Sequence, residues 1–275
     1  MYIAKNVKSV LGKVGTGITE PIIGIIDGKQ AIIKTINNDE GNKVLINEIV
    51  CSSMAKMLNL PIADYGVCVI DDSTLFENNF IIDKERYGPG YFTYRLDNVT
   101  SIVNSPKLIN KYIENKECFL KIILFDCLVY NKDRHKGNIL MSTGKKDSSN
   151  MVYIIDHSHV FNIGSLWDKY QLKRMMQEND YESIEVFEYN KSIYELLLKS
   201  IDFSIEYNVL LKEAETVKNI FTKEFFNHVI KDIPNEWNTD PEDTEMLIEY
   251  LLYRVNHVEE IVKLIFKFIK TQITN

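Results

Sequence analysis

The chain has 275 residues, of which 45% are hydrophobic, and a formal net charge of −7 at pH 7. This length and apolar content support a large core, in one bilobal domain or in two small ones. The acidic charge and the lack of a basic face argue against direct nucleic acid binding.

The cysteines and the apolar segments give no sign of an exported or membrane protein. Residues 1–13 lack the apolar core of a signal peptide. Charged residues interrupt the apolar tail over residues 246–273, so this tail is not expected to span a membrane. Four cysteines lie far apart without a C-x-x-C pair: Cys51, Cys68, Cys118 and Cys127. They are typical of small buried side chains in a reducing compartment, and we expect a cytoplasmic protein.

The first 41 residues have the pattern of strands joined by glycine turns. Apolar runs predict strands over residues 7–10, 21–26 and 30–36. Asp27-Gly28 between the last two runs predicts a hairpin turn. Gly12, Gly15 and Gly17 lie within six residues and allow the backbone to approach a ligand closely. Two interpretations are open for this glycine cluster, namely a loop that cradles phosphates and an ordinary hairpin turn.

Lys34 follows the apolar residues of the third predicted strand. A lysine in this position is either a solvated edge charge or a side chain that reaches the phosphates of a nucleotide. The next segment, residues 41–59, has the apolar spacing of a helix and carries Glu48. An ion pair between Lys34 and Glu48 would fix the lysine, whereas the alternative is a glutamate exposed to solvent.

The middle of the chain predicts further strands and then a change to helices. The strands are expected over residues 64–70, 78–82 and 91–96, with a turn at 71–73 and a loop at 83–90. The change falls near residues 96–104, and Ser105-Pro106 begins the helical part.

The segment between residues 119 and 161 contains the most informative pattern. An apolar helix over residues 119–129 precedes a polar loop, 131–138, and two short apolar strands surround a polar turn at 142–150. The hairpin brings Asp156 back beside Asn138, and Asp133 lies five positions before Asn138.

Two carboxylates and an amide, gathered where the polar loop and the hairpin meet, are the groups that phosphoryl transfer requires. Asn138 and Asp156 offer the hard oxygen ligands that suit Mg²⁺. Asp133 could accept or orient a hydroxyl proton, and its interval to Asn138 matches the catalytic loop of protein kinases. The alternative is an ordinary loop, because Asp and Asn are common in turns.

The stretches YNKDRHKGNIL and YIIDHSHVF resemble the HipA-like kinases, a bacterial branch of atypical protein kinases, and faintly resemble the phosphatidylinositol kinases. The resemblance implies an α+β, two-lobed protein-kinase-like fold, with a β-rich N-lobe over residues 1–97 and a helical C-lobe over residues 98–275. It implies transfer of the γ-phosphate of ATP, with Mg²⁺, to a Ser or Thr hydroxyl of a protein or of the chain itself. The chain would be a short form without an extra N-terminal domain.

The resemblance also implies roles for single residues. Asp133 would be the catalytic base, and Asn138 and Asp156 would hold Mg²⁺. Lys34 would steady the α and β phosphates of ATP, and Glu48 would hold Lys34. The neighbouring Asn47 and Glu40 are weaker candidates for this last role, because the family pattern places a Glu after an Asn in this helix.

The glycine cluster becomes a nucleotide loop by the same resemblance. The residues expected to bind ATP there are Gly12, Gly15, Thr16 and Gly17. Some family members phosphorylate their own loop, which makes Thr16 and Thr19 candidates for self-modification. Some relatives also pair with a HipB-like antitoxin, so such a partner is expected beside an unknown protein substrate.

The sequence departs from ordinary protein kinases in three ways. Arg134 and His135 follow the Asp instead of preceding it, His-Ser follows Asp156, and no Ala-Pro-Glu comes after. Activation-loop regulation of the usual kind is therefore not implied. We expect His135 and His157 to orient the two carboxylates, with a zinc site of Asp156, His157 and His159 as the alternative.

Three other functions stay open. The protein could be a lipid or small-molecule kinase of the same fold, an inactive kinase-fold binding module, or an unrelated protein with a chance motif.

The C-terminal part predicts helices over residues 167–178, 195–199, 204–220 and 223–230. Asp240-Pro241 begins one closing helix, which runs to about residue 272 and packs on the C-lobe.

Overall fold

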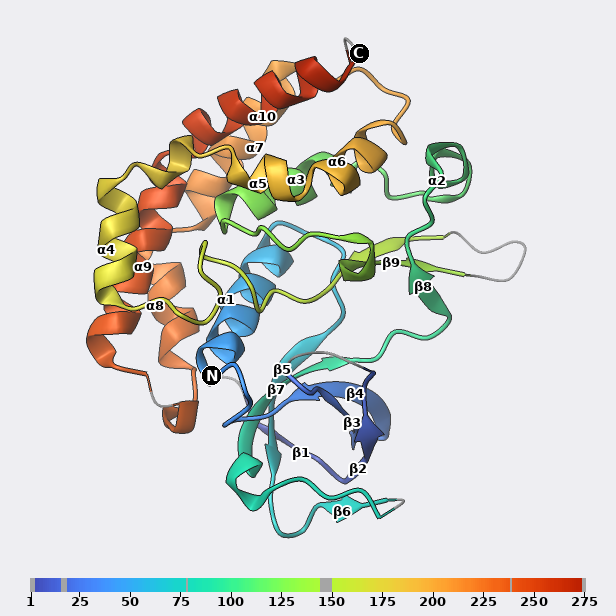
Figure 1. Ribbon diagram of the computed structural model, residues 1–275, viewed down its shortest axis with the longest axis vertical. Helices are drawn as coiled ribbons and strands as arrows, with labels where there is room; N and C mark the ends of the chain where they lie inside the picture. The colour runs from blue at the N-terminus through green and yellow to red at the C-terminus, as the bar shows by residue number, and fades with distance from the viewer. Residues whose placement is uncertain (1–2, 16–18, 78, 144–149, 238, 274–275) are drawn as a thin grey trace.

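The computed structural model describes residues 3–15, 19–77, 79–143, 150–237 and 239–273, and it divides into a sheet at one end and helices at the other (Figure 1). The N-terminal sheet has seven strands in the order β1-β5-β7-β4-β3-β2-β6. The strands are β1 (Lys5–Asn6), β2 (Ser9–Lys13), β3 (Ile22–Ile26), β4 (Lys29–Lys34), β5 (Tyr65–Ile70), β6 (Leu75–Phe76) and β7 (Gly88–Tyr94).

The hairpin between β3 and β4 forms at the predicted turn. Asp27 and Gly28 both have positive φ, 51° and 76°, and connect the paired residues Ile26 and Lys29. Two residues with positive φ give the turn the twist that matches the two strands. The hairpin places Lys34 at the end of β4, where the strand faces the helices.

Helix α1 (Lys43–Met57) is buried on nearly all sides because it packs against the sheet and also against helix α8 (Lys223–Lys231). Asn47 and Glu48 are therefore buried with the apolar residues of the helix. Buried polar side chains need polar partners, and the partners of these two residues define much of the site below.

A second, three-stranded sheet connects the two ends of the molecule. Its strands are β8 (Val99–Ser101), β9 (Ile139–Ser142) and β10 (Val152–Ile154), in the order β10-β9-β8. The antiparallel pair of β9 and β10 is the predicted hairpin, and it aligns Ile139 with Ile154. Strand β8 was not predicted.

The remaining chain is helical and surrounds helix α3 (Cys118–Leu128), which is almost wholly buried. The other helices are α2 (Pro106–Tyr112), α4 (Lys169–Gln177), α5 (Glu185–Tyr189), α6 (Lys191–Leu198), α7 (Tyr207–Ile220), α9 (Pro241–Asn256) and α10 (Val258–Ile273). Single 3-10 turns are η1 (Lys84–Arg86), η2 (Lys136–Asn138), η3 (Asp180–Glu182) and η4 (Asn235–Trp237). In the part of the chain that the structure describes, no helix is long and apolar enough to cross a membrane.

Two strand predictions were wrong. Residues 79–82, the described part of the expected strand over 78–82, form no strand, and β6 lies just before them. Strand β7 begins at Gly88 rather than at residue 91. A side chain at Gly90 would place Cβ 2.7 Å from the carbonyl oxygen of Lys34, so the glycine permits the close approach of β7 to β4.

The prediction of a single closing helix was also wrong, because two helices, α9 and α10, meet at His257. This residue leaves the helical conformation, with φ −100° and ψ 17°. Its ring Nδ1 lies 2.9 Å from the carbonyl oxygen of Tyr253, one turn earlier. Asp240 caps α9 as predicted, since its side chain accepts a hydrogen bond from the amide of Glu242.

Candidate active site

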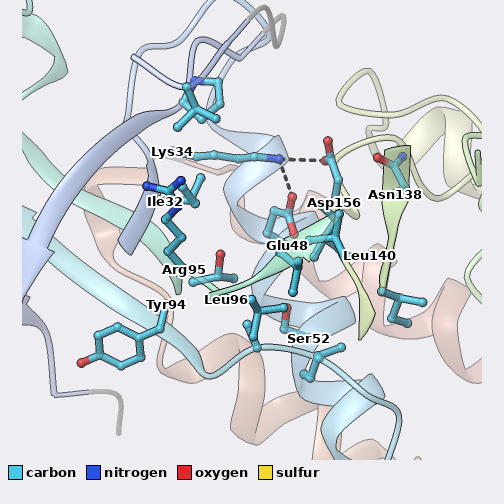
Figure 2. Close-up of a pocket in the computed structure, with 18 of the residues that line it drawn as sticks. Ile32, Lys34, Glu48, Ser52, Tyr94, Arg95, Leu96, Asn138, Leu140 and Asp156 are labelled. Carbon is cyan, nitrogen blue, oxygen red and sulfur yellow. Dashed lines mark hydrogen bonds and ion pairs between the residues drawn. The ribbon is translucent and has the colours of Figure 1, made fainter. Parts of the chain in front are cut away.

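A cavity of about 790 Å³ lies between the N-terminal sheet and the β8–β10 sheet (Figure 2). Its volume is in the range of sites for small ligands. Strand β4, helix α1, the segment after β7 and the β9–β10 hairpin all contribute to its wall. The lining residues used below are Gly15, Ile32, Lys34, Glu48, Leu96, Asn138, Leu140 and Asp156.

Lys34 lies at the centre of a polar cluster in this cavity. Its Nζ is 2.5 Å from Glu48 Oε1 on α1 and 2.8 Å from Asp156 Oδ1 after β10. Figure 2 shows both contacts, which join three segments that are far apart in the sequence. The structure thus contains the ion pair expected between Lys34 and Glu48, and it adds Asp156 as a second partner.

Within this cluster the lysine and the carboxylates that contact it favour each other's charged forms. Burial alone would lower the pKa of Lys34, but the carboxylates of Glu48 and Asp156 outweigh burial and hold the pKa above its ordinary value. Burial would likewise raise the pKa of Glu48, but Lys34 and His157 hold it below its ordinary value. Both members of the buried pair are therefore charged at neutral pH.

The buried pair of Lys34 and Glu48 makes the folded protein less stable at acid pH. Because the pKa of Glu48 is depressed in the folded state, its contribution is complete above about pH 5 and is lost progressively as the pH falls below the ordinary pKa of about 4.3 toward the lower folded-state value. Lys34 has a raised pKa, so its contribution is present below about pH 10 and does not alter the acid side. We expect the free energy of unfolding to fall about 1 kcal/mol further between pH 7 and pH 4 in the wild type than in Glu48→Gln. Urea unfolding at the two pH values measures this difference, and equal losses would contradict it.

Asp156 is turned into the cavity by its own backbone and by Ser158. Its φ is +60°, a left-handed conformation that is uncommon for this residue type. The Ser158 hydroxyl donates to Asp156 Oδ1 at 2.5 Å and lies 2.6 Å from Lys34 Nζ. Burial would raise the pKa of Asp156, but Lys34 and Ser158 keep it well below its usual range. The carboxylate therefore stays charged, as a metal ligand has to be.

Asn47 holds the segment that follows Asp156. Its side-chain Nδ2 donates to the carbonyl oxygens of Ser158, at 2.6 Å, and Gly164, at 3.0 Å. Its Oδ1 accepts from Trp167 Nε1 at 2.8 Å. Asn47 thus fastens this segment to α1, beside the residue that pairs with Lys34, and it makes no part of the Lys34 pair itself.

Asn138 and Asp133 are joined within their loop. Asn138 Nδ2 donates to the backbone carbonyl of Asp133 at 2.8 Å, so its Oδ1 is the side-chain atom left for other contacts. The amide of Ile155, the residue before Asp156, donates to the carbonyl oxygen of Asn138 at 3.1 Å, and Asn138 and Asp156 both line the cavity (Figure 2). The Asp133 side chain is half-exposed. The structure therefore brings the side-chain oxygens of Asn138 and Asp156 to one part of the cavity and leaves the Asp133 carboxylate accessible to solvent.

A buried ion pair that sequence reasoning missed supports this loop. Arg134 contacts the Asp126 carboxylate of α3 with two nitrogens, Nη2 at 2.8 Å and Nε at 3.0 Å, and both side chains are fully buried. Arg134 Nη1 also donates to the carbonyl oxygens of Asn138 and Ile155, at 3.1 Å each. One arginine thus ties α3 to the backbone of Asn138 and to the residue just before Asp156.

The histidines lie differently from the prediction. The backbone N–H of His157 donates to Glu48 Oε1 at 3.2 Å and its ring packs beside the same glutamate, so it does not orient Asp156. His135 Nε2 lies 3.9 Å from Asp133 Oδ1. The ring Nε2 of His159 lies 2.8 Å from Oε1 of Glu40. Among the described residues no group of three or more His, Cys, Asp or Glu side chains could hold a metal, so the alternative zinc site is not formed.

The glycine cluster is only partly described. Gly15 has a positive φ of 49° and lines the cavity. Gly12 lies at a register shift between β2 and β3 and is not among the lining residues. Thr16 and Gly17 lie outside the described residues, and Thr19 is buried.

Comparison with known proteins gives a family and a fold. A family model described as HipA-like kinase matches residues 7–264. The crystal structure of the Helicobacter pylori proinflammatory kinase CtkA is 12% identical, with a TM-score of 0.54, over 91% of this chain and 92% of that one. This likeness confirms the predicted protein-kinase-like fold, with a β-sheet N-terminal region and a helical C-terminal region. The domain limit at residues 97 and 98 stays a prediction.

Two further solved structures are more remote. WaaP, solved in complex with acyl carrier protein, is 11% identical with a TM-score of 0.36, over 81% of this chain and 89% of that one. The MAP kinase LmaMPK10 from Leishmania major is 14% identical with a TM-score of 0.26, over 92% and 81% of the two chains. The comparison with curated proteins gives no match.

Proposed function

Because the chain belongs to the HipA-like kinase family, whose members are phosphotransferases, we propose that it transfers the γ-phosphate of ATP to a Ser or Thr hydroxyl of a protein. The observation that carries this proposal is the contact of Lys34 Nζ with Glu48 and Asp156, at 2.5 and 2.8 Å, in the wall of the large cavity. A charged lysine held by a helix glutamate next to an aspartate is the arrangement with which kinases hold phosphates and metal.

The cavity has room and a suitable wall for a nucleobase. Ile32 and Leu140 supply apolar side chains, and Leu96 lies in the segment that follows β7. The amide of Arg95 donates to the carbonyl oxygen of Gln30 at 2.9 Å, which places the backbone of the next residue just beyond this contact with β4. We propose that adenine lies between the apolar side chains, with the backbone of Leu96 as its polar contact.

The donor set fits Mg²⁺ with its phosphates. Asn138 and Asp156 offer two hard oxygen ligands side by side, and this ion completes its shell with water and phosphate oxygens. Bound Mg²⁺ would neutralise charge that develops on the transferred phosphoryl group. Glu48 would hold Lys34 in position with Mg²⁺ bound, so the lysine would remain available to the α and β phosphates.

Asp133 is proposed to accept the proton of the acceptor hydroxyl. Its half-exposed carboxylate is accessible to a second molecule, while its backbone is fixed by Asn138 and by Asn131, whose Oδ1 accepts from the Asp133 amide at 2.9 Å. An accessible base on a fixed loop suits an acceptor carried by another protein. A HipB-like partner stays an expectation of the family.

The acceptor class is tested by following the label from γ-³²P-ATP in a cell extract with Mg²⁺. We expect labelled Ser or Thr in proteins, or in the chain itself, with the wild type, and a loss of at least about 100-fold with Lys34→Met. Lys212→Met, at an exposed position on α7, is the matched control and should label as the wild type does. Label found only in lipids or small molecules would show that the acceptor is not a protein. ATP binding without transfer of any label would favour an inactive binding module.

A further inference from the structure

His159 joins the proposed active site to a carboxylate from another part of the chain. Its ring Nε2 lies 2.8 Å from Oε1 of Glu40, which belongs to the loop between β4 and α1. Its other nitrogen, Nδ1, lies 3.7 Å from Oδ2 of Asp133. The two ring nitrogens therefore face two carboxylates, one behind the histidine and one at the proposed site of proton transfer.

The contact with Glu40 fixes the tautomer of the ring. A carboxylate only accepts hydrogen bonds, so the short contact requires that Nε2 carries a proton and donates it to Glu40. In the neutral imidazole the lone pair then lies on Nδ1, on the side of Asp133. The second oxygen of Glu40, Oε2, is buried and has no hydrogen-bond partner among the residues that the structure describes, so the contact with His159 is the one that the carboxylate makes there. A carboxylate behind a histidine holds the base of the serine hydrolases in the same manner.

The distance to Asp133 leaves space for an acceptor. At 3.7 Å, Nδ1 and Oδ2 are too far apart to bond directly, but one hydroxyl oxygen can lie about 2.8 Å from both. The geometry therefore points to His159 as a second proton acceptor for phosphoryl transfer, beside Asp133, with Glu40 as its positioning residue. This inference rests on the function proposed above.

His135 shows why the tautomer matters. Its Nδ1 accepts a hydrogen bond from the amide of Gly137 at 3.0 Å, so the proton of its neutral ring lies on Nε2, the nitrogen that faces Asp133. His135 can therefore donate toward the carboxylate but has no lone pair there. Of the two histidines that flank Asp133, His159 is the one that presents an acceptor.

The step balances without a further reagent. The acceptor hydroxyl has one proton, which on this second route passes to Nδ1 of His159 rather than to Asp133, while the hydroxyl oxygen forms a bond to the γ-phosphorus. The bond from that phosphorus to the bridging oxygen breaks, and ADP leaves with the electron pair. Nε2 keeps its proton and its contact with Glu40, which stabilises the imidazolium, and the proton on Nδ1 is then lost to solvent.

The test separates a proton acceptor from a bridge between loops. The variants are His159→Ala and His159→Gln, and the measurement is ADP formed from Mg²⁺–ATP, together with ATP affinity. Glutamine keeps an N–H that can donate to Glu40 but has no basic nitrogen. We expect both variants to lose about 100-fold in turnover with little change in ATP affinity. Added imidazole should restore about tenfold of the loss in His159→Ala, in a saturable manner.

A control and two outcomes complete the experiment. His228→Ala, at an exposed position on α8, should retain wild-type turnover and show no response to imidazole. Retained turnover in His159→Gln, or a loss in His159→Ala that imidazole does not restore, would overturn the role of proton acceptor while the wild type still forms ADP. No ADP from the wild type would overturn the proposed function, and this inference with it.

Discussion

Replacing Asp156 with Asn is expected to lower the turnover of Mg²⁺–ATP about 1000-fold and to remove most of the dependence of ATP affinity on Mg²⁺. The substitution keeps the shape of the side chain but removes its charge. The charged carboxylate of Asp156 is the stronger of the two oxygen ligands proposed for the metal. Lys34 retains Glu48 at 2.5 Å, so the lysine proposed to bind phosphate stays in place. The loss should therefore appear in the metal response more than in nucleotide binding without metal.

This prediction is checked by titrating Mg²⁺ against ADP formation and by calorimetry of ATP binding with and without the metal. Asp202→Asn is the matched control, because Asp202 is exposed in the segment between α6 and α7. It should behave as the wild type. A variant of Asp156 whose ATP affinity responds to Mg²⁺ as strongly as that of the wild type would show that the metal is held elsewhere.

Replacing Asp126 with Ala is expected to lower the free energy of unfolding by about 4 kcal/mol. The change would leave the guanidinium of Arg134 buried without its carboxylate partner. It would also remove the acceptor of the Asn131 side chain, at 2.8 Å, and of the Tyr194 hydroxyl, at 3.1 Å. Urea unfolding of the variant against the wild type measures the loss.

The double variant Asp126→Leu with Arg134→Met separates the buried charge from the packing. It fills the same space with apolar side chains and leaves no unpaired ion, so it should recover part of the stability that Asp126→Ala loses, while Asn131 and Tyr194 still lack their acceptor. Because Arg134 also binds the carbonyls of Asn138 and Ile155, turnover should stay low even where stability returns. A double variant as unstable as the single one would show that the ion pair is not the source of the loss.

The sequence predicted the parts of the site that depend on local order. The hairpin of β9 and β10 is a contact between neighbouring segments, and its register brings Asn138 and Asp156 to one end. The pair of Lys34 and Glu48 was found because the order of glycine cluster, hairpin turn, lysine and helix glutamate matches that of kinases, as the family resemblance also implied. In both cases the chain between the partners is short or regular.

Polar residues with distant partners were missed. Asn47 bonds to Ser158 and Trp167, more than 100 residues away, and no pattern in the sequence identifies those partners. Asp126 did carry a signal, because it is the one acidic residue of the apolar segment that forms α3, and a carboxylate there is seldom buried without a partner. The identity of that partner, Arg134, came only from the fold.

The errors in secondary structure have a common origin. Gly88-Pro89-Gly90 has the composition of a loop, but pairing with the distant strand β5 makes it part of a strand. The apolar spacing continues through His257, so the end of α9 is not visible in the periodicity. Local propensity is overridden wherever packing between distant segments decides the backbone.

The central claim is that this site transfers a phosphoryl group with Asp133 as a base, and the most direct measurement is transfer of label from γ-³²P-ATP by the wild type and by Asp133→Asn. We predict Mg²⁺-dependent label on Ser or Thr with the wild type and at least about 100-fold less with the variant, which still binds ATP. The claim would be contradicted by a wild type that binds ATP and transfers no label, or by a variant that labels as fast as the wild type.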